Sequence, residues 1–223
     1  MIQTDACFYL YPGETSPLTL PALSISKGQR VLLIGPSGSG KTTLLHLLSG
    51  ILEARQKTDV NGYRLDKMKD AERRAFRIGQ LGLVFQDFRL LEYLNVSENI
   101  LLPLRIESTS GSGSIKSHRA RLERLAESLK ISHKLKSNVN ELSQGEKQRV
   151  SLCRCLIADP AVILADEPTG SLDPETKRLA IEQLFQYSGL GKATLIMATH
   201  DHSLVDRFDQ VVELGDSNPA AKS

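Results

Sequence analysis

Residues 35–43 read GPSGSGKTT and combine small residues with one lysine and two threonines. The segment fits the pattern G-x-x-x-x-G-K-S/T at every fixed position. Glycines let the backbone wrap closely around an anion, so that successive N–H groups point at phosphate oxygens. A helix that begins near Lys41 would add its positive dipole end, Lys41 a mobile cation and the Thr42 hydroxyl a ligand for Mg²⁺. These residues predict binding of a nucleoside triphosphate, with a Gly/Ser-rich strand-to-helix turn as the structural alternative. The residues expected to bind it are Gly35, Pro36, Ser37, Gly38, Ser39, Gly40, Lys41, Thr42 and Thr43.

Two acidic residues follow an apolar run at positions 162–168, which read VILADEP. Asp166, at the predicted end of a strand, can hold Mg²⁺ directly or through water. Glu167 is a candidate general base for an attacking water molecule. Neighbouring side chains on an extended chain point to opposite sides, and Pro168 favours an extended Glu167, so the two acids can take different partners. An acidic exit from a strand is the structural alternative.

A third candidate site begins at Ser143, in the segment LSQGEKQRV of residues 142–150. Ser143 precedes Glu146 by three residues, which predicts a capping box at a helix start. That arrangement is a complete structural explanation of both residues. The same geometry, with Gly145 carrying no side chain, also provides a helix N-terminus suited to a terminal phosphate.

These residues need elements that position them. The apolar run RVLLIG at residues 30–35 predicts a buried strand directly before the phosphate-binding segment. Helical apolar spacing over residues 42–49 predicts a helix directly after it, ending at Gly50. Further strands are predicted over residues 6–10, 18–25, 81–86, 161–166, 193–199 and 210–214. One further helix is predicted to begin at Ser97 and to be limited by Pro103. Others are predicted over residues 115–130, 143–158, 174–187 and 203–208.

Strands that alternate with helices predict an α/β protein with a parallel sheet covered on both faces. The largely helical residues 97–158 interrupt this alternation and are expected to be an insertion into the sheet core. Residues 107–114, ESTSGSGS, are predicted to be a flexible surface connection within one domain that spans residues 1–223.

Composition excludes several classes of protein. The net charge is +2 and the basic residues are spread along the chain, so no nucleic-acid partner is expected. No apolar run approaches the roughly 18 residues that span a bilayer, and the first ten residues lack the pattern of a signal peptide. We therefore expect a soluble, cytosolic protein. Cys7, Cys153 and Cys155 fit no common zinc or redox spacing and are expected to be buried thiols.

The order of these motifs resembles the nucleotide-binding subunit of ATP-binding cassette (ABC) transporters over nearly the whole chain. The shared features are the phosphate loop, Gln86 at the end of a strand, the signature at residues 142–146, VILADEP, the tripeptide Ser171-Leu172-Asp173 and His200 at the end of another strand. The resemblance implies an ABC-type P-loop NTPase fold: a mostly parallel sheet flanked by helices, an N-terminal antiparallel β subdomain and an inserted helical subdomain. It also implies an ATPase that uses ATP and Mg²⁺.

Several residue roles follow from the resemblance alone. Gln86 would touch Mg²⁺ and the attacking water, and His200 would contact the γ-phosphate and orient Glu167. Tyr11, rather than Tyr9, would stack on adenine. Two cassettes would face head to tail, so that the signature acts on the partner's ATP. The residues expected to act in trans are Ser143, Gly145, Glu146 and Asp173. An N-cap role for Asp173 before Pro174 is compatible with this.

The chain departs from the usual signature LSGGQ because Gln144 replaces a glycine. We expect activity with altered dimer closure. The usual Ser-Gly turn is replaced by TDVNG at residues 58–62, which should matter little. Residues 85–104, with ADEPTGSLD and ATHD, are similar to the branch of lipoprotein-releasing, macrolide-exporting and cell-division ATPases. That branch implies a homodimer, peripheral on the inner face of the cell membrane, beneath an integral membrane permease. Two alternatives stay open: a non-transport ABC ATPase, and a regulatory module that clamps ATP with little hydrolysis.

Overall fold

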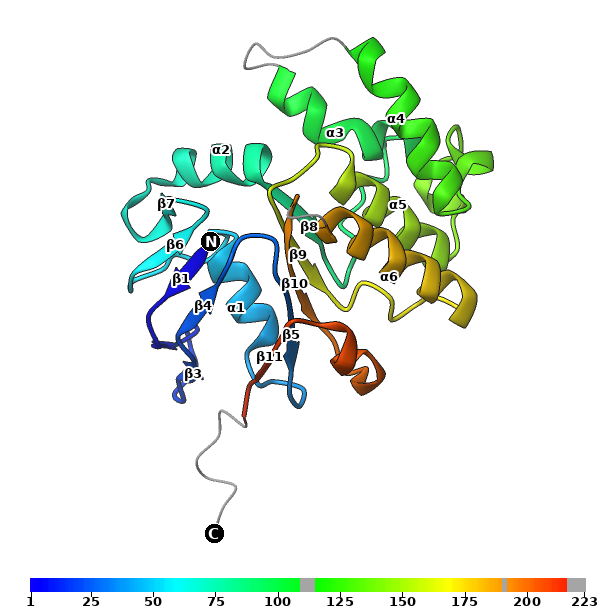
Figure 1. Ribbon diagram of the computed structural model, residues 1–223. Coiled ribbons are helices and arrows are strands. Elements are labelled where there is room, and N and C mark those ends of the chain that lie inside the picture. The colour runs from blue at the N-terminus through cyan, green and yellow to red at the C-terminus, as the bar shows by residue number, and fades with distance from the viewer. Residues whose placement is uncertain (109–114, 190–191, 216–223) are drawn as a thin grey trace.

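A parallel sheet forms the centre of the protein, in a computed structural model that describes residues 1–108, 115–189 and 192–215 (Figure 1). Its strand order is β11-β5-β10-β9-β8, and all four neighbouring pairs are parallel. Each strand lies within a range predicted from sequence. The bounds are β5 Arg30–Ile34, β8 Leu81–Val84, β9 Val162–Asp166, β10 Thr194–Ala198 and β11 Gln210–Glu213.

Both faces of this sheet are buried, because alternate side chains of each strand enter two different hydrophobic clusters. On β9, Ile163 and Ala165 pack on one side with helices α5 (Gln144–Leu156) and α6 (Pro174–Ser188). Val162 and Leu164 pack on the other side with helix α1 (Lys41–Leu48). The period of two along a strand produces this division, and the predicted cover on both faces is confirmed.

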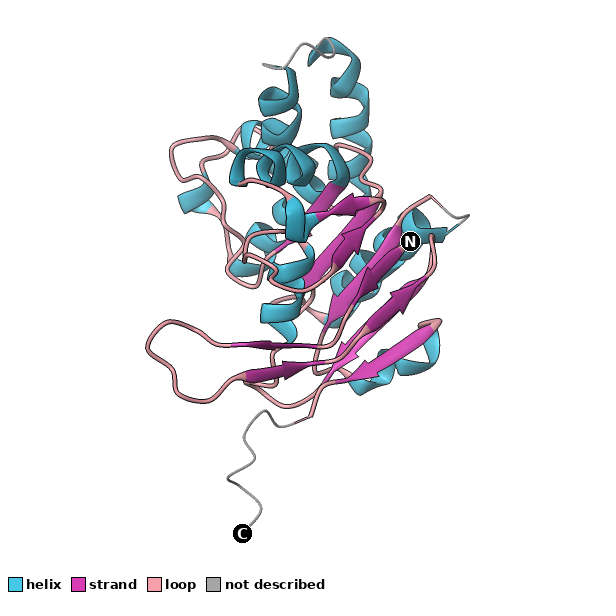
Figure 2. Ribbon diagram, turned by 90° about the vertical axis from the view of Figure 1, so that its left-hand side faces the viewer, coloured by secondary structure: helices cyan, strands magenta, loops and turns pink. Residues whose placement is uncertain are grey.

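An antiparallel sheet covers α1 from the side opposite the parallel sheet. Its order is β4-β1-β6-β7, and β2 and β3 form a separate pair (Figure 2). Ile2, Ile25 and Val60 of this sheet share one cluster with the buried leucines of α1. The bounds are β1 Ile2–Thr4, β2 Cys7–Tyr9, β3 Leu18–Leu20, β4 Leu23–Ile25, β6 Thr58–Val60 and β7 Tyr63–Arg64.

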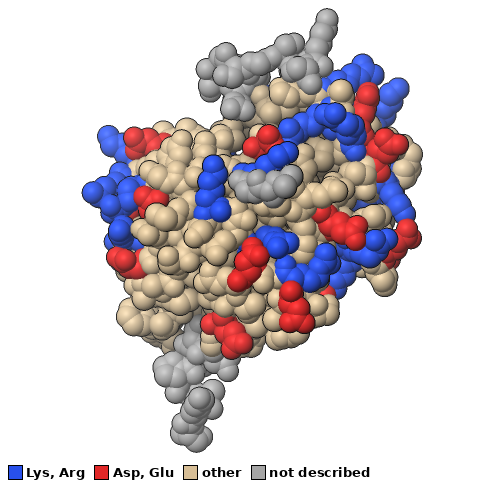
Figure 3. Space-filling view, in the orientation of Figure 1, with Lys and Arg blue, Asp and Glu red and all other residues tan. Residues whose placement is uncertain are grey.

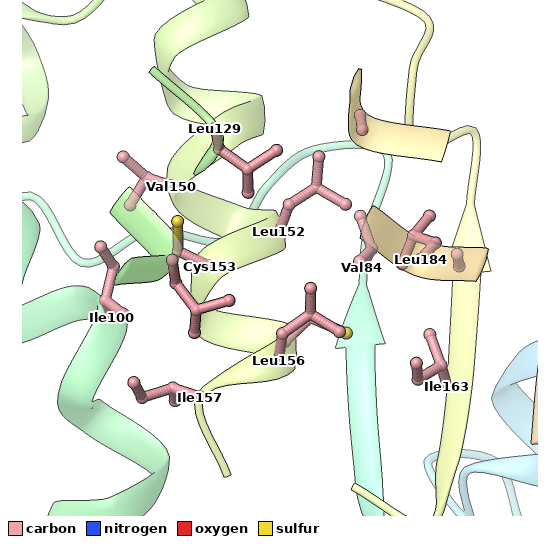
Figure 4. Packing of buried hydrophobic residues seen from close by; sticks show 14 of the residues in the cluster. Val84, Ile100, Leu129, Val150, Leu152, Cys153, Leu156, Ile157, Ile163 and Leu184 are labelled. Atoms are coloured by element: carbon pink, nitrogen blue, oxygen red, sulfur yellow. The ribbon is translucent and has the colours of Figure 1, made fainter. Parts of the chain in front are cut away.

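The helical insertion between β8 and β9 packs around α5. Figure 4 shows Val150, Leu152 and Leu156 of α5 between Ile100 of helix α3 (Val96–Ser108) and Val84 of β8. Helix α4 (Ile115–Ser128) lies at the outside of this insertion (Figure 1). Helix α2 (Asp70–Gln80) precedes β8, and its Phe76 packs in the cluster of α1 and the antiparallel sheet instead. The 3₁₀ turns are η1 Leu65–Lys67, η2 Ser132–Lys134, η3 Val139–Glu141 and η5 His202–Arg207. No helix in the described ranges is long and apolar enough to cross a membrane.

Pro103 does not end a helix, contrary to the expectation from sequence. Helix α3 continues through it to Ser108. A proline removes one helical hydrogen bond, but Ile100 and Leu104 on either side are buried in the cluster around α5, and this packing offsets the loss. The predicted flexible connection falls largely on residues 109–114, which lie outside the described residues.

Candidate functional site

The phosphate loop connects a buried strand to a helix, as predicted. β5 ends at Ile34 and α1 begins at Lys41, so Gly35 to Gly40 form the turn. A Cβ at Gly35 would lie 2.2 Å from the Leu214 carbonyl oxygen, and Gly40 has a φ of 95°. Only glycine fits both constraints without strain. The α1 N-terminus therefore opens directly onto this loop.

Lys41 and Thr42, the first two residues of α1, contact different partners. The Lys41 ammonium donates to the carbonyl oxygens of Gly35, at 2.7 Å, and of Pro36, at 2.9 Å. The Thr42 hydroxyl donates to the Asp166 carboxylate at 2.6 Å. Burial raises the pKa of Asp166, the Thr42 hydrogen bond opposes that shift and the neighbouring Glu167 adds to it. The phosphate loop and the segment VILADEP, which are far apart in the sequence, are therefore in contact through Thr42 and Asp166.

The Glu167 side chain contacts Thr199 and His200, which directly follow β10. Its Oε1 lies 2.9 Å from Nδ1 of His200, and its Oε2 accepts a hydrogen bond of 3.1 Å from the Thr199 hydroxyl. The Glu167 side chain is 17% exposed and that of His200 is 80% exposed. The carboxylate is thus largely sheltered and fixed in orientation, while the imidazole faces the surroundings.

The backbone at Glu167 differs from the sequence expectation. Pro168 predicted an extended conformation, whereas Glu167 has a φ of 46°, in the left-handed region. A non-glycine residue is held there only when surrounding contacts fix it. Its N–H donates to the Ala198 carbonyl at 2.9 Å, and its own carbonyl accepts from the Gly170 N–H at 3.3 Å. These contacts override the local preference, yet the two acids still take different partners.

Two cavities share Gln86 and Glu167. One of about 310 Å³ is lined by the phosphate loop and by Tyr11 and Asp166, so it brings together the residues predicted to bind nucleotide and metal. The larger one, of about 590 Å³, also includes His200 and lies against α5. We assign the triphosphate to the smaller cavity, because the loop amides and Lys41 border it.

Tyr11 lies beside the phosphate loop. Its hydroxyl is 2.9 Å from the Thr43 hydroxyl, and its ring meets the Tyr9 ring edge-on at 4.9 Å between centroids. Tyr11 lines the phosphate-loop cavity, whereas Tyr9 is not among its lining residues. The geometry therefore favours Tyr11 over Tyr9 as the aromatic residue next to a bound nucleotide.

The signature residues lie at the start of α5 and do not line the phosphate-loop cavity of their own chain. The predicted capping box is present: the Glu146 N–H donates to Ser143 Oγ at 3.3 Å, and the Ser143 N–H donates to the Glu146 carboxylate at 2.8 Å. The bonds from Ser143 and the nearby Lys134 lower the pKa of Glu146 in spite of its burial. Asp173 caps α6 by accepting from the Thr176 N–H at 3.1 Å.

Two residues of this network were not singled out from sequence. Thr199 directly precedes His200, so its position next to a predicted site residue was a signal for it. Gln148 lies within the quoted segment LSQGEKQRV, but nothing in its type or spacing indicated that its side chain contacts the segment after β9. Its Nε2 donates to the Glu167 carbonyl and its Oε1 accepts from the Ser171 N–H, both at 2.9 Å.

The oxygen donors of the site suit Mg²⁺. Thr42 and Asp166 are in contact, and Gln86 borders the same cavity. Hydroxyl, carboxylate and amide oxygens are the ligands that this ion prefers. Within the described ranges no group of three or more His, Cys, Asp or Glu side chains could hold a metal by itself. The site therefore fits an ion that is shared with phosphate oxygens.

Comparisons with known proteins give consistent matches. The model of the family described as "ABC transporter" matches residues 18–170. An uncharacterized ABC transporter ATP-binding protein of Bacillus subtilis, YvcR, is 41% identical over 94% of this chain and 80% of its own length. The lipoprotein-releasing system ATP-binding protein LolD 1 of Rhodopirellula baltica is 36% identical over 92% of this chain and 90% of its own length.

Solved structures of the bacterial ABC transporter cassette MJ0796 are also similar. A dimeric structure of this cassette is 29% identical, with a TM-score of 0.89 over 97% of this chain and 95% of the other. A dimeric post-hydrolysis state bound to ADP and Pi is 28% identical, with the same TM-score and coverage.

Proposed function

Because this chain belongs to the ABC transporter family, as an ATP-binding and ATP-hydrolysing subunit, we propose that two copies clamp ATP and Mg²⁺ between them and drive a separate integral membrane permease. The observation that carries the proposal is the contact network across β9 and β10. It places a sheltered Glu167, bonded to Thr199 and beside His200, next to the Thr42–Asp166 pair. The phosphate loop and the Glu167 side chain therefore border one cavity.

In this proposal the phosphate loop binds and orients the triphosphate. The amides of residues 35–43 and the Lys41 ammonium neutralise its charge, and Tyr11 stacks on the adenine. Thr42, Asp166 and Gln86 would hold Mg²⁺, which when bound supplies positive charge to the β- and γ-phosphate oxygens. For scale, removing one preorganised donor from an oxyanion-stabilising site typically costs about 2.7–4 kcal/mol of transition-state stabilisation.

Glu167 is the proposed general base. Its carboxylate accepts a proton from the attacking water, while Thr199 and His200 keep the carboxylate in one orientation. His200 is exposed enough to contact the γ-phosphate at the same time. Gln86 borders both cavities and would touch the water and the metal from the side of the helical insertion.

A second copy completes the proposed site. The signature residues lie at an exposed helix start, away from the chain's own phosphate-loop cavity. Ser143, Gly145 and Glu146, with Asp173 at the next helix start, would therefore meet the partner's nucleotide in trans. The similar cassette MJ0796 has been solved as a dimer, which supports this arrangement. We also propose that residues 97–158 form a helical subdomain within one domain spanning residues 1–223.

Replacement of the base tests the proposal. Glu167→Gln keeps the shape of the side chain but removes the proton acceptor, so we expect steady-state phosphate release to fall by at least about 100-fold. Because the triphosphate then persists, ATP with Mg²⁺ should convert the protein to a stable dimer in sedimentation velocity.

The matched control is Glu182→Gln, which removes an exposed carboxylate paired with Arg178 at 3.0 Å on α6. This variant should hydrolyse ATP like the wild type. A Glu167→Gln protein that remains monomeric with ATP and Mg²⁺ would contradict the proposed clamp.

We further propose a permease of the lipoprotein-releasing or macrolide-exporting type, which would place the chain at the inner face of the cell membrane. The relatives named LolD and the similarity of residues 85–104 to that branch support this partner class. Co-purification from detergent extracts with a permease encoded next to this chain is the expected result. A chain that never co-purifies, and whose phosphate release the permease does not change, would count against this partner class.

A further inference from the structure

Gln148 is a buried polar residue in the second turn of α5, which is called the signature helix because the signature residues lie at its start. It follows Glu146 by two residues and is 1% exposed. Burial of an amide is unfavourable unless its hydrogen bonds are replaced. Both ends of this amide are paired: Nε2 donates to the Glu167 carbonyl and Oε1 accepts from the Ser171 N–H.

The two backbone groups that Gln148 contacts belong to the segment that carries the proposed base. Glu167 is held in a left-handed conformation, and Ser171 begins the short loop to Asp173, which caps α6. A Cβ at Gly145 would lie 3.3 Å from the Ser171 carbonyl oxygen, so the first turn of α5 packs against the same loop. One helix therefore contacts this segment through a side chain and through its backbone.

We propose that Gln148 is a positioning residue for ATP hydrolysis, which fixes the backbone of Glu167 and the Ser171–Asp173 loop relative to the signature helix. This inference rests on the proposed function of Glu167. A side chain in this position must donate to a carbonyl and accept from an N–H at once, and a neutral amide of this length does both. Methionine has nearly the same shape and makes neither bond, and glutamate can accept but donates only when protonated.

Gln148→Met is the principal test, in the purified full chain with ATP and Mg²⁺. Loss of both hydrogen bonds frees the Glu167 backbone, so we expect kcat to fall by about tenfold or more. The KM for ATP should stay within about threefold, because the phosphate loop is untouched. The matched control is Gln80→Met, which removes a glutamine bonded to Asn61 at 3.1 Å. Gln80 directly precedes β8, at the opposite end of that strand from Gln86, so this variant should leave kcat unchanged.

A merely structural role predicts a different pattern. Gln148 would then affect the midpoint of thermal unfolding, and kcat per folded molecule would stay within about twofold of the wild type. That result overturns the proposal. The proposed function fails separately, if the wild type releases no phosphate or if Glu167→Gln retains full turnover.

Gln148→Glu keeps the proposal testable if the methionine variant does not fold. Its ionised carboxylate accepts from Ser171 but cannot donate to Glu167, so kcat should be low at pH 8. The ratio of its kcat to that of the wild type should stay well below one from pH 6 to pH 8, because a glutamate with its ordinary pKa is ionised throughout this range and cannot donate. A ratio that equals one overturns the donor role.

Discussion

At the scale of single residues, the proposed chemistry depends on two neighbouring carboxylates in unlike surroundings. Asp166 is buried against the Thr42 hydroxyl, and burial raises its pKa. Glu167 turns away into a left-handed conformation and receives a hydrogen bond from Thr199, which is 2% exposed. The sheltered hydroxyl is therefore well placed to fix the orientation of the base.

Thr199→Val tests this orientation. The change keeps the side-chain shape but removes the hydroxyl, so we expect kcat for ATP hydrolysis to fall by about tenfold, with the KM for ATP little changed. Thr199→Ser should retain most activity. Thr194→Val is the matched control, because Thr194 is a buried threonine at the other end of β10 and accepts from the Gly28 N–H at 3.0 Å, away from the site. Equal kcat losses in both valine variants would argue against a specific role for Thr199.

At the scale of elements, the sequence predicted the helices and strands that have a clear hydrophobic pattern or are bounded by turn residues. The five strands of the parallel sheet were found, because continuous apolar runs bounded by turn residues identify buried strands. The short strands β1, β6 and β7 were missed, and the predicted strand over residues 18–25 proved to be two strands, β3 and β4. Runs of two or three residues carry too little periodic signal to be separated. Helix α2 was also missed, because only Phe76 of its residues is buried and most of the others are polar or charged, so few apolar positions marked the helix in the sequence.

The functional site, too, was predicted only in part from the sequence. Motifs placed the phosphate loop, Asp166, Glu167 and His200, and the comparisons confirm the predicted ABC-type fold and ATPase class. Side-chain contacts between distant segments had no signal in the sequence. Arg154, near the end of α5, donates to the carbonyls of Phe88 and Arg89, which both have positive φ values. This contact fixes the turn after Gln86 to the signature helix, and only the folded chain reveals it.

At the scale of the whole molecule, α1 lies between two sheets, and a helical layer covers the far side of the parallel sheet. Acidic and basic side chains are interspersed on the face shown in Figure 3. Two ion pairs strongly lower the pKa of their carboxylates. Hydrogen bonds from Arg64 and from Lys177 lower the pKa of Asp66 and of Asp201, respectively, from 3.8 to about 2.

These two pKa shifts predict how the free energy of unfolding depends on pH. A carboxyl whose pKa is lower in the folded state stabilises the fold above the unfolded pKa and loses that contribution as pH falls through the folded value. The free energy of unfolding should therefore decline between about pH 4 and about pH 2. Asp201→Asn should make this decline shallower, as measured by urea unfolding at several pH values. The control is Asp206→Asn, an exposed carboxylate of the same 3₁₀ turn; an identical slope in Asp201→Asn would contradict the prediction.

The position of α5 has a consequence for cooperativity. In the proposed dimer, the N-terminus of this helix faces one nucleotide while Gln148, further along, contacts the backbone of Glu167 at the other. In that dimer, α5 would connect the nucleotide of one site to the base of the other. We therefore expect ATP hydrolysis at the two sites to be coupled even in the absence of a membrane protein.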